Sequence, residues 1–213
     1  KCSVDRYRLP ALEQLTAMVD AGHYHEKTAA LKRMIDHGVV AVITSCLASE
    51  YDSSCQLQRN ALKLLLAVAA NATTSFVVPA TTALCDAELL KRAIRVVIHA
   101  GATENAALAV EALQRIFHGA LDNYGWACNM KLQQWARDSG VLPGLVEFAV
   151  ASEKSLAVAL PAITVLVDLW SSDCNFDVAT PVLPLLKCAL QFPEHVPKAL
   201  RAIRDISAMR GGA

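Results

Sequence analysis

Residues 138–148 read Asp-Ser-Gly-Val-Leu-Pro-Gly-Leu-Val-Glu-Phe, a glycine-marked bend followed by an apolar run with an early proline. A similar run, Val-Leu-Pro-Leu-Leu, begins at Val182, 41 residues after Val141. The apolar pattern that follows each run repeats at nearly the same distance, since Ile203 lies 40 residues after Ile163. Two consecutive helices displaced together by about 40 residues match the unit length of helical repeat proteins. The sequence therefore predicts an array of helical repeats.

Apolar residues recur at helical spacing through most of the chain, most regularly at Leu156, Leu160, Ile163, Val167 and Trp170. Comparable stripes lie within residues 57–68, 90–97, 109–116 and 196–206. No segment shows sustained strand alternation. Glycines follow several of these runs, as left-handed helix C-caps would: Gly22, Gly38, Gly101, Gly119 and Gly140. This pattern predicts an all-α fold of about nine or ten helices.

Residues 1–213 are expected to form a single domain built from these repeats. We expect this domain to be a fragment of a longer array of repeats. Residues 1–22 would form a partial repeat. The complete repeats would cover residues 24–70, 84–118, 127–171 and 178–208. The longest irregular segments are expected at residues 71–83 and 119–128.

The run at residues 138–148 resembles the armadillo pattern, with a short first helix, a glycine at the bend, and a second helix that opens with proline and a Leu-Val pair. Proline costs little in a first helical turn, because the N–H that it lacks would have no partner there. The resemblance is best over residues 127–207, fair over 26–70 and weak over 83–117. Membership of the armadillo-repeat (ARM/HEAT-like) superfamily, without a subfamily, implies a right-handed α-solenoid of armadillo-like helical repeats.

In armadillo proteins the third helix of each repeat lines a concave groove. Those that bind extended peptides, such as nuclear-import adaptors and catenins, place tryptophan and asparagine there. The matching positions here are Lys63 and Ala67, Glu111 and Arg115, Thr164 and Asp168, and Arg201 and Asp205. None of them is tryptophan or asparagine, which argues against recognition of nuclear-localisation peptides. The resemblance thus implies a mixed-charge groove for a folded or helical partner, and the alternative is that these are ordinary solvated positions.

Three aromatic residues lie in and just after the second long connection, namely Tyr124, Trp126 and Trp135. Aromatic side chains near a loop are candidate anchors for a partner, with Tyr124 and Trp126 the nearest to it. The alternative is that they pack under the loop and close a gap between irregular repeats. Trp170 continues an apolar stripe and is predicted to belong to the core.

The composition narrows the classes of function. Hydrophobic residues make up 54% of the 213 residues, and formal net charge is zero, so nothing favours nucleic acid or an anionic membrane. Residues 64–85 carry no charge, but Asn71, Pro79 and several threonines interrupt them, so no membrane insertion is expected. Seven cysteines without a CxxC pair indicate buried reduced thiols and a cytoplasmic protein, with nuclear or cytoskeletal association as alternatives.

Catalytic and metal-binding motifs are missing from the sequence. His23 and His25 lack the further ligands that a metal needs. His118 with Cys128, or Cys174 with Asp173, could be imagined as nucleophile pairs, but neither pair lies in a known motif. We therefore expect no enzyme and no cofactor.

The function predicted from the sequence is that of a protein-binding scaffold or adaptor. The alternatives are a regulatory or chaperone-type module that acts on an ATPase or GTPase, as armadillo-like domains do in Hsp70 exchange factors, myosin chaperones and formins, or a structural subunit of a cytoskeletal or ciliary assembly. The identity of the partner and the oligomeric state stay open.

Overall fold

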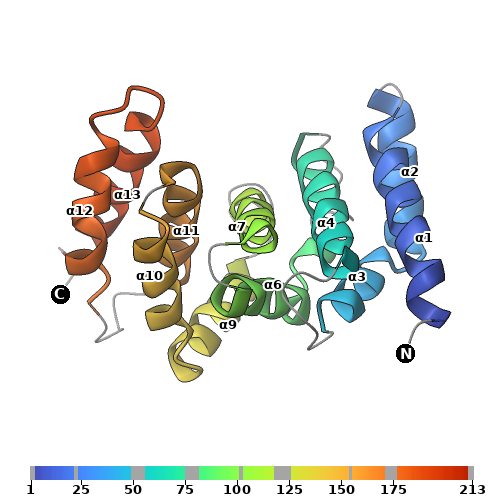
Figure 1. The fold of residues 1–213 in the computed structure, drawn as a ribbon, viewed down its shortest axis with the longest axis horizontal. Helices are drawn as coiled ribbons and strands as arrows, with labels where there is room; N and C mark the ends of the chain where they lie inside the picture. Colours follow the sequence, from blue (N-terminus) through green and yellow to red (C-terminus); the bar gives the residue numbers. More distant parts are fainter. Residues whose placement is uncertain are drawn as a thin grey trace. The chain divides into compact units, whose positions relative to one another are not determined.

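The protein is described by a computed structural model covering residues 3–21, 24–48, 56–74, 82–100, 103–117, 126–153, 155–170 and 177–210. Within these ranges the chain forms helices and no strand, so the predicted all-α class is confirmed (Figure 1). The helices of nine to nineteen residues are α1 (Ser3–Asp20), α2 (Tyr24–Asp36), α3 (Val39–Leu47), α4 (Gln56–Thr74), α6 (Ala87–Ala100), α7 (Glu104–Ile116), α9 (Trp126–Asp138), α10 (Val141–Ala151), α11 (Leu156–Leu169), α12 (Ala179–Ala189) and α13 (Val196–Arg210).

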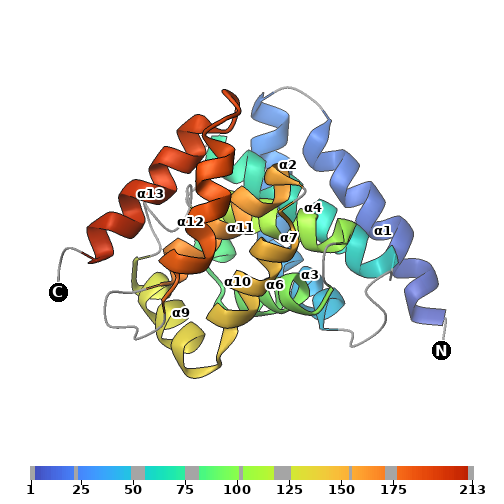
Figure 2. The same cartoon turned by 60° about the vertical axis from the view of Figure 1, so that its left-hand side comes forward.

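The chain divides into two compact units, residues 1–128 and 129–213. In the first unit, α4 packs between α1 and α7, and these three helices form one layer. α3 and α6 pack on each other and form a second layer, with α3 against α4 and α6 against α7. α2 runs beside α1 in both views (Figures 1 and 2) and also contacts α3 and α4. The core of this unit lies between the two layers.

The buried positions of the first layer recur every 45 residues. The matching buried pairs of α4 and α7 are Asn60 and Asn105, Ala61 and Ala106, Leu65 and Val110, and Val68 and Leu113. α1 continues the series, because its buried Leu12 and Val19 lie 45 residues before Leu57 and Leu64. Neighbouring helices of this layer therefore present the same positions to the core.

In the second unit, α11 is the central helix, since it contacts α10, α12 and α13. α10 also packs on α12, and α12 on α13. The buried positions of α13 follow those of α11 by 40 residues, as with Ala159 and Ala199, Ala162 and Ala202, and Leu166 and Ile206. The 40-residue distance predicted for these two helices is thus also the distance between their buried positions.

Several helix boundaries differ from the sequence pattern. The partial repeat expected over residues 1–22 contains one helix, α1, which begins at Ser3 and has Pro10 inside it. α4 continues to Thr74, where an irregular segment was expected from residue 71, and the Asn71 side-chain amide donates to the Ala67 carbonyl at 2.9 Å. α12 begins at Ala179 and contains Pro184, whereas the corresponding Pro143 lies in the first turn of α10.

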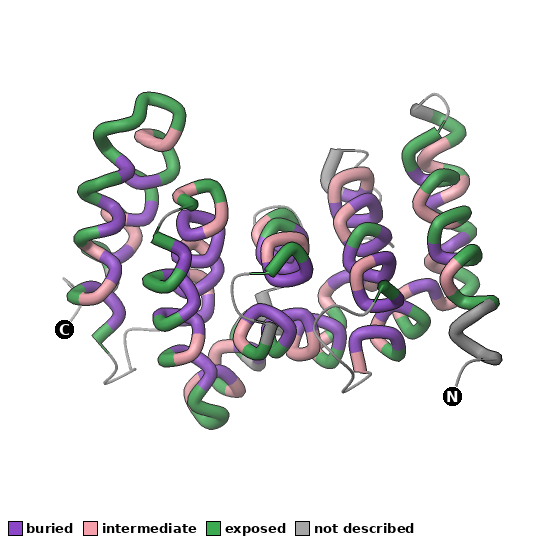
Figure 3. The backbone as a smooth tube through the Cα atoms, in the orientation of Figure 1, coloured by how far each residue is buried: buried purple, intermediate pink, exposed green. Residues whose placement is uncertain are grey.

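The apolar stripe of α13 differs from its prediction at two positions. Leu200 is 52% exposed and Ile203 is half-buried, although their counterparts Leu160 and Ile163 on α11 are buried. α11 packs against α10, α12 and α13, whereas the main packing neighbours of α13 are α11 and α12. Exposed and half-buried positions alternate with buried ones along α13 (Figure 3). Trp170, predicted to be core, is buried.

Two of the predicted glycine caps have positive φ, with Gly38 at 77° and Gly140 at 66°. Each lies between two consecutive helices, α2 and α3 or α9 and α10. Gly22, Gly101 and Gly119 lie outside the described residues. Among the helices described, none has the length and apolar character needed to cross a membrane.

We expect Gly140→Val to cost about 1–2 kcal/mol of unfolding free energy, because a left-handed conformation places Cβ close to the following carbonyl. A Cβ at Gly140 would meet no other atom within 4 Å, so the backbone alone sets the cost. Gly140→Asn is the matched control and should cost less, because asparagine tolerates this region better. Urea denaturation measures both, and equal stability of wild type and Gly140→Val would contradict the cap.

Candidate functional site

Of the four candidate groove positions of the first unit, three are exposed on α4 and α7 and one is buried. Lys63 is exposed on α4, and Ala67, the matching position one turn later, is buried. On α7, Glu111 and Arg115 are both exposed and form an i,i+4 ion pair, with Nη2 and Oε1 3.0 Å apart. These three charged side chains are exposed to a partner. The ion pair among them lies within α7 and does not join α7 to α4.

The packing register shows that these residues are not equivalent positions. In the 45-residue register, Lys63 corresponds to Leu108 on α7, while Glu111 and Arg115 correspond to Leu66 and Ala70 on α4. The armadillo pattern aligned Lys63 with Glu111, 48 residues apart, whereas the buried positions of the two helices are 45 residues apart. The two alignments therefore differ by three residues. The positions of α4 that correspond to the charges of α7 are therefore half-buried apolar residues and not a second charged row.

In the second unit, Thr164 and Asp168 are half-buried on α11. The Thr164 hydroxyl donates to the Leu160 carbonyl at 3.0 Å, and the Asp168 carbonyl accepts from the Gln133 side chain of α9 at 3.0 Å. The Thr164 hydroxyl is thus engaged within α11, and the Asp168 backbone carbonyl joins α11 to α9.

Arg201 and Asp205 form an i,i+4 ion pair on α13 at 3.7 Å, and Arg204 also contacts Asp205, at 2.7 Å. In the 40-residue register, Arg201 and Asp205 correspond to the buried Pro161 and Val165 of α11. The two helices therefore do not present Thr164, Asp168, Arg201 and Asp205 as one repeated row.

The aromatic candidates are only partly described. Tyr124 lies outside the described residues, and Trp126 is the first residue of α9, so it begins a helix rather than lying in a connection. The side chain of Trp126 is also outside the described part. Trp135, on the same helix, is half-buried.

A buried polar network that the pattern match missed ties the first layer together. Asn60 is 4% exposed, and its amide donates to the Glu13 carboxylate of α1 at 3.0 Å while its carbonyl accepts from Gln56 at 3.0 Å. Asn105 is 1% exposed and donates to the Gln58 carbonyl at 3.0 Å.

Arg59 extends the same network, with Nε 3.5 Å from the Asn105 carbonyl and Nη2 3.3 Å from the Glu104 carboxylate. Asn60 and Asn105 are therefore inside this layer, each bonded to a neighbouring helix. The signal in the sequence was an Asn-Ala pair repeated after 45 residues, at Asn60-Ala61 and Asn105-Ala106.

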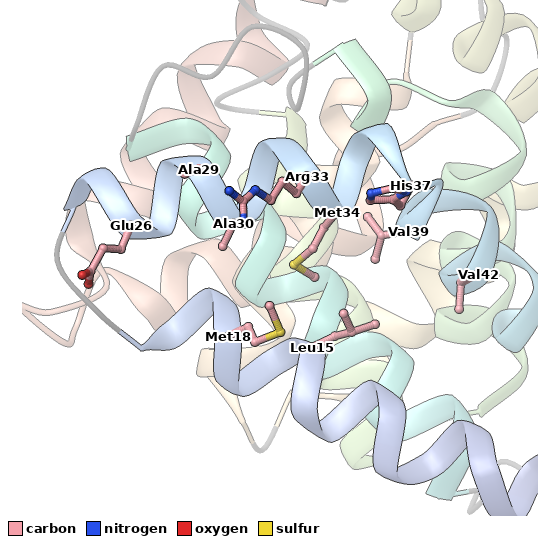
Figure 4. A pocket seen from close by; sticks show the side chains of 10 residues that line it. All are labelled: Leu15, Met18, Glu26, Ala29, Ala30, Arg33, Met34, His37, Val39 and Val42. Carbon is pink, nitrogen blue, oxygen red and sulfur yellow. The ribbon is translucent and has the colours of Figure 1, made fainter.

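A groove of about 570 Å³ with a largely apolar lining lies between α1, α2 and the start of α3 (Figure 4). Its apolar surface comes from all three helices, with Leu15 and Met18 from α1, Ala29, Ala30 and Met34 from α2, and Val39 and Val42 from α3. Met18 is 54% exposed and Val42 is 42% exposed. Three polar side chains of α2 and its end complete the lining, namely Glu26, Arg33 and His37. We name this surface the α1–α3 groove.

A second opening, of about 590 Å³, lies between α3 and α6. Small residues such as Gly38, Ala41 and Ala83 line it. Its charged side chains are engaged in their own helix, because Asp86 accepts from the Leu89 N–H at 2.8 Å and Glu88 pairs with Arg92 at 2.7 Å. The charged side chains of this opening therefore already have hydrogen-bond or ion-pair partners within the protein.

The chemistry-bearing residues do not converge in the part of the chain that the structure describes. No group of three His, Cys, Asp or Glu side chains there could hold a metal ion. Cys46, Cys85 and Cys188 are not in disulfides, and Cys188 is exposed, although buried thiols were expected. The imagined catalytic pairs, His118 with Cys128 and Cys174 with Asp173, lie at positions whose side chains are outside the description.

Comparison with protein-family models, curated proteins and solved structures gave no match to this chain.

Proposed function

We propose that the protein is a protein-binding scaffold, and that each unit is a segment of an armadillo-type right-handed solenoid. The observation that carries this proposal is the repeated packing register, 45 residues in the first layer and 40 residues between α11 and α13. A layer of helices in register holds its outward side chains in fixed positions before any partner arrives. Less conformational entropy is then lost on association.

The docking surface proposed for the first unit is the outward side of α4 and α7, which we name the α4–α7 face. It carries exposed charges of both signs at Lys63, Glu104, Glu111 and Arg115. Such a face suits a partner with complementary charges, for which rim charges set specificity and association rate. A cytoplasmic setting fits this proposal, because Cys46 and Cys188 would stay reduced there.

Exchanging the α7 charges tests this function. The variant Glu111→Arg with Arg115→Glu reverses the local field but keeps an i,i+4 pair, so the helix loses little stability. We expect a partner captured by the wild-type protein from cell extract to bind this variant at least about tenfold more weakly, because like charges now face each other. Quantitative mass spectrometry of the captured proteins, followed by titration of the purified partner, measures the loss.

The matched control exchanges another i,i+4 pair of the same unit, as Glu88→Arg with Arg92→Glu on α6. That helix belongs to the second layer, so the control should retain the partner. Equal loss in both variants, or no loss in either, would show that the α4–α7 face does not bind the partner.

A further inference from the structure

Two hydrogen bonds of the first layer are equivalent in its 45-residue register. The Asn60 side-chain amide donates to the Glu13 carboxylate of α1 at 3.0 Å. The Asn105 amide donates to the side-chain carbonyl of Gln58 on α4, also at 3.0 Å. Each donor follows its acceptor by 47 residues, and both asparagines are buried. The layer therefore repeats one polar contact between neighbouring helices.

The apolar positions of α4 and α7 do not by themselves fix how these two helices align. Apolar burial has no direction and depends on the area removed from water. In a 48-residue register, shifted by three residues, buried apolar positions of α7 would still match buried apolar positions of α4. The matched pairs would be Ala109 with Ala61, Val110 with Leu62, Leu113 with Leu65, and Ile116 with Val68.

The repeated polar contact distinguishes the two alignments. A shift of three residues moves a helix by about 4.5 Å along its axis, which is too far for the hydrogen bond to survive. The Asn105 amide would leave Gln58, and Asn60 would match Leu108 in place of Asn105. A buried polar group that loses its partner is costly, and a single buried asparagine fixes the register of coiled coils for this reason.

The register also decides which charges share a row on the α4–α7 face. Arg59 and Glu104, equivalent in the 45-residue register, form an ion pair between α4 and α7 at 3.3 Å, so side chains in one row reach each other. Lys63 shares its row with Leu108 and makes no ion pair with another described residue. In the 48-residue register, Lys63 would share its row with Glu111 and be neutralised by it.

We propose that Asn60 and Asn105 are positioning residues, whose hydrogen bonds hold α1, α4 and α7 in the 45-residue register and keep Lys63 apart from Glu111. The Lys63 ammonium is then a cation that a carboxylate of the partner can meet. The role of the face rests on the proposed function, whereas the register is a property of the protein alone and is tested without a partner.

Replacing both members of one polar contact tests the register without leaving a buried group unpaired. Gln58→Met with Asn105→Leu, which we name the apolar variant, should stay folded. Double electron–electron resonance between spin labels at Gln14 and Arg115, both exposed, measures the alignment of α1 with α7. The labels are attached to an encoded keto amino acid, so the native cysteines stay intact. The wild type should give one distance, and the apolar variant should add a second one, displaced by up to about 4.5 Å.

The matched control exchanges the two residues, as Gln58→Asn with Asn105→Gln. It keeps an amide donor and an amide acceptor between the helices, so it should give one distance, as the wild type does. Residues that only stabilise the unit would lower the midpoint of urea denaturation and leave the distance unchanged. One unchanged distance in the apolar variant would therefore overturn the proposal, and so would a second distance of equal amplitude in the exchange variant.

Partner capture from cell extract separates failure of the register from failure of the face. The apolar variant should retain the captured partner about tenfold more weakly than the exchange variant, because Glu111 then neutralises Lys63. A second distance with unchanged capture would overturn the role of Lys63 and count against the α4–α7 face, while the register assignment stands. One distance in the apolar variant, with capture lost on exchanging Glu111 and Arg115, would overturn the positioning role and leave the proposed function standing.

Discussion

Leu160→Asp should destabilise the second unit more than any other change considered for this protein. Leu160 is 2% exposed on α11, the helix that contacts α10, α12 and α13. A carboxylate there would be buried without a partner, which costs about 3–5 kcal/mol. That is a large fraction of the roughly 5–15 kcal/mol that stabilises an ordinary domain. Far-UV circular dichroism during urea denaturation measures the loss.

The same substitution at two positions of α13 provides graded controls. Ile203→Asp should cost less, because Ile203 is half-buried and its carboxylate can reach water. Leu200→Asp should change the unfolding free energy by about 0.5 kcal/mol or less, as exposed substitutions usually do. If Leu160→Asp were as stable as Leu200→Asp, α11 would not be the central helix of this unit.

Asn105→Leu should destabilise the first unit by about 1–3 kcal/mol, the second largest effect expected. The change leaves the buried Gln58 carbonyl without the donor that now lies 3.0 Å away, and an orphaned buried polar group costs that much. Leucine has the same number of side-chain heavy atoms as asparagine and a larger volume, so the substitution leaves no cavity. Thermal and urea unfolding of the wild type and variant measure it.

A double-mutant cycle separates the network from simple packing. Gln58→Met with Asn105→Leu removes both partners, and the double variant should lose less stability than the two single variants added together. Additive losses would mean that the Gln58–Asn105 hydrogen bond contributes nothing to holding α4 against α7.

Local periodicity accounts for most of what the sequence predicted about the fold. Stripes such as Leu156 to Trp170 correspond to single helices, because an amphipathic helix needs only its own spacing to be recognisable. Gly38 and Gly140 lie at the bends between consecutive helices for an equally local reason, because glycine adopts positive φ without a steric penalty from Cβ. The α-helical class and the positions of these two bends were therefore readable from short stretches of chain.

The candidate site was harder to predict, because it depends on how helices align with one another. The ladder comparison placed Lys63 level with Glu111, whereas the packing aligns Lys63 with Leu108. The periodicity of one helix does not fix its axial position against the next. That position follows from contacts between helices, among them the hydrogen bonds of Asn60 to α1 and of Asn105 to α4.

By itself, the sequence determined the all-helical class, two of the glycine bends and the 40-residue repeat of the last helices, since these depend on neighbours within a few turns. Only the tertiary structure decided that Leu160 is core while its counterpart Leu200 is exposed. It likewise decided that the asparagines of the first layer face inward and that α1, α2 and α3 leave an apolar groove. The physical reason is that burial depends on which helices cover a side chain, and identical stripes are covered differently at different places in the packing.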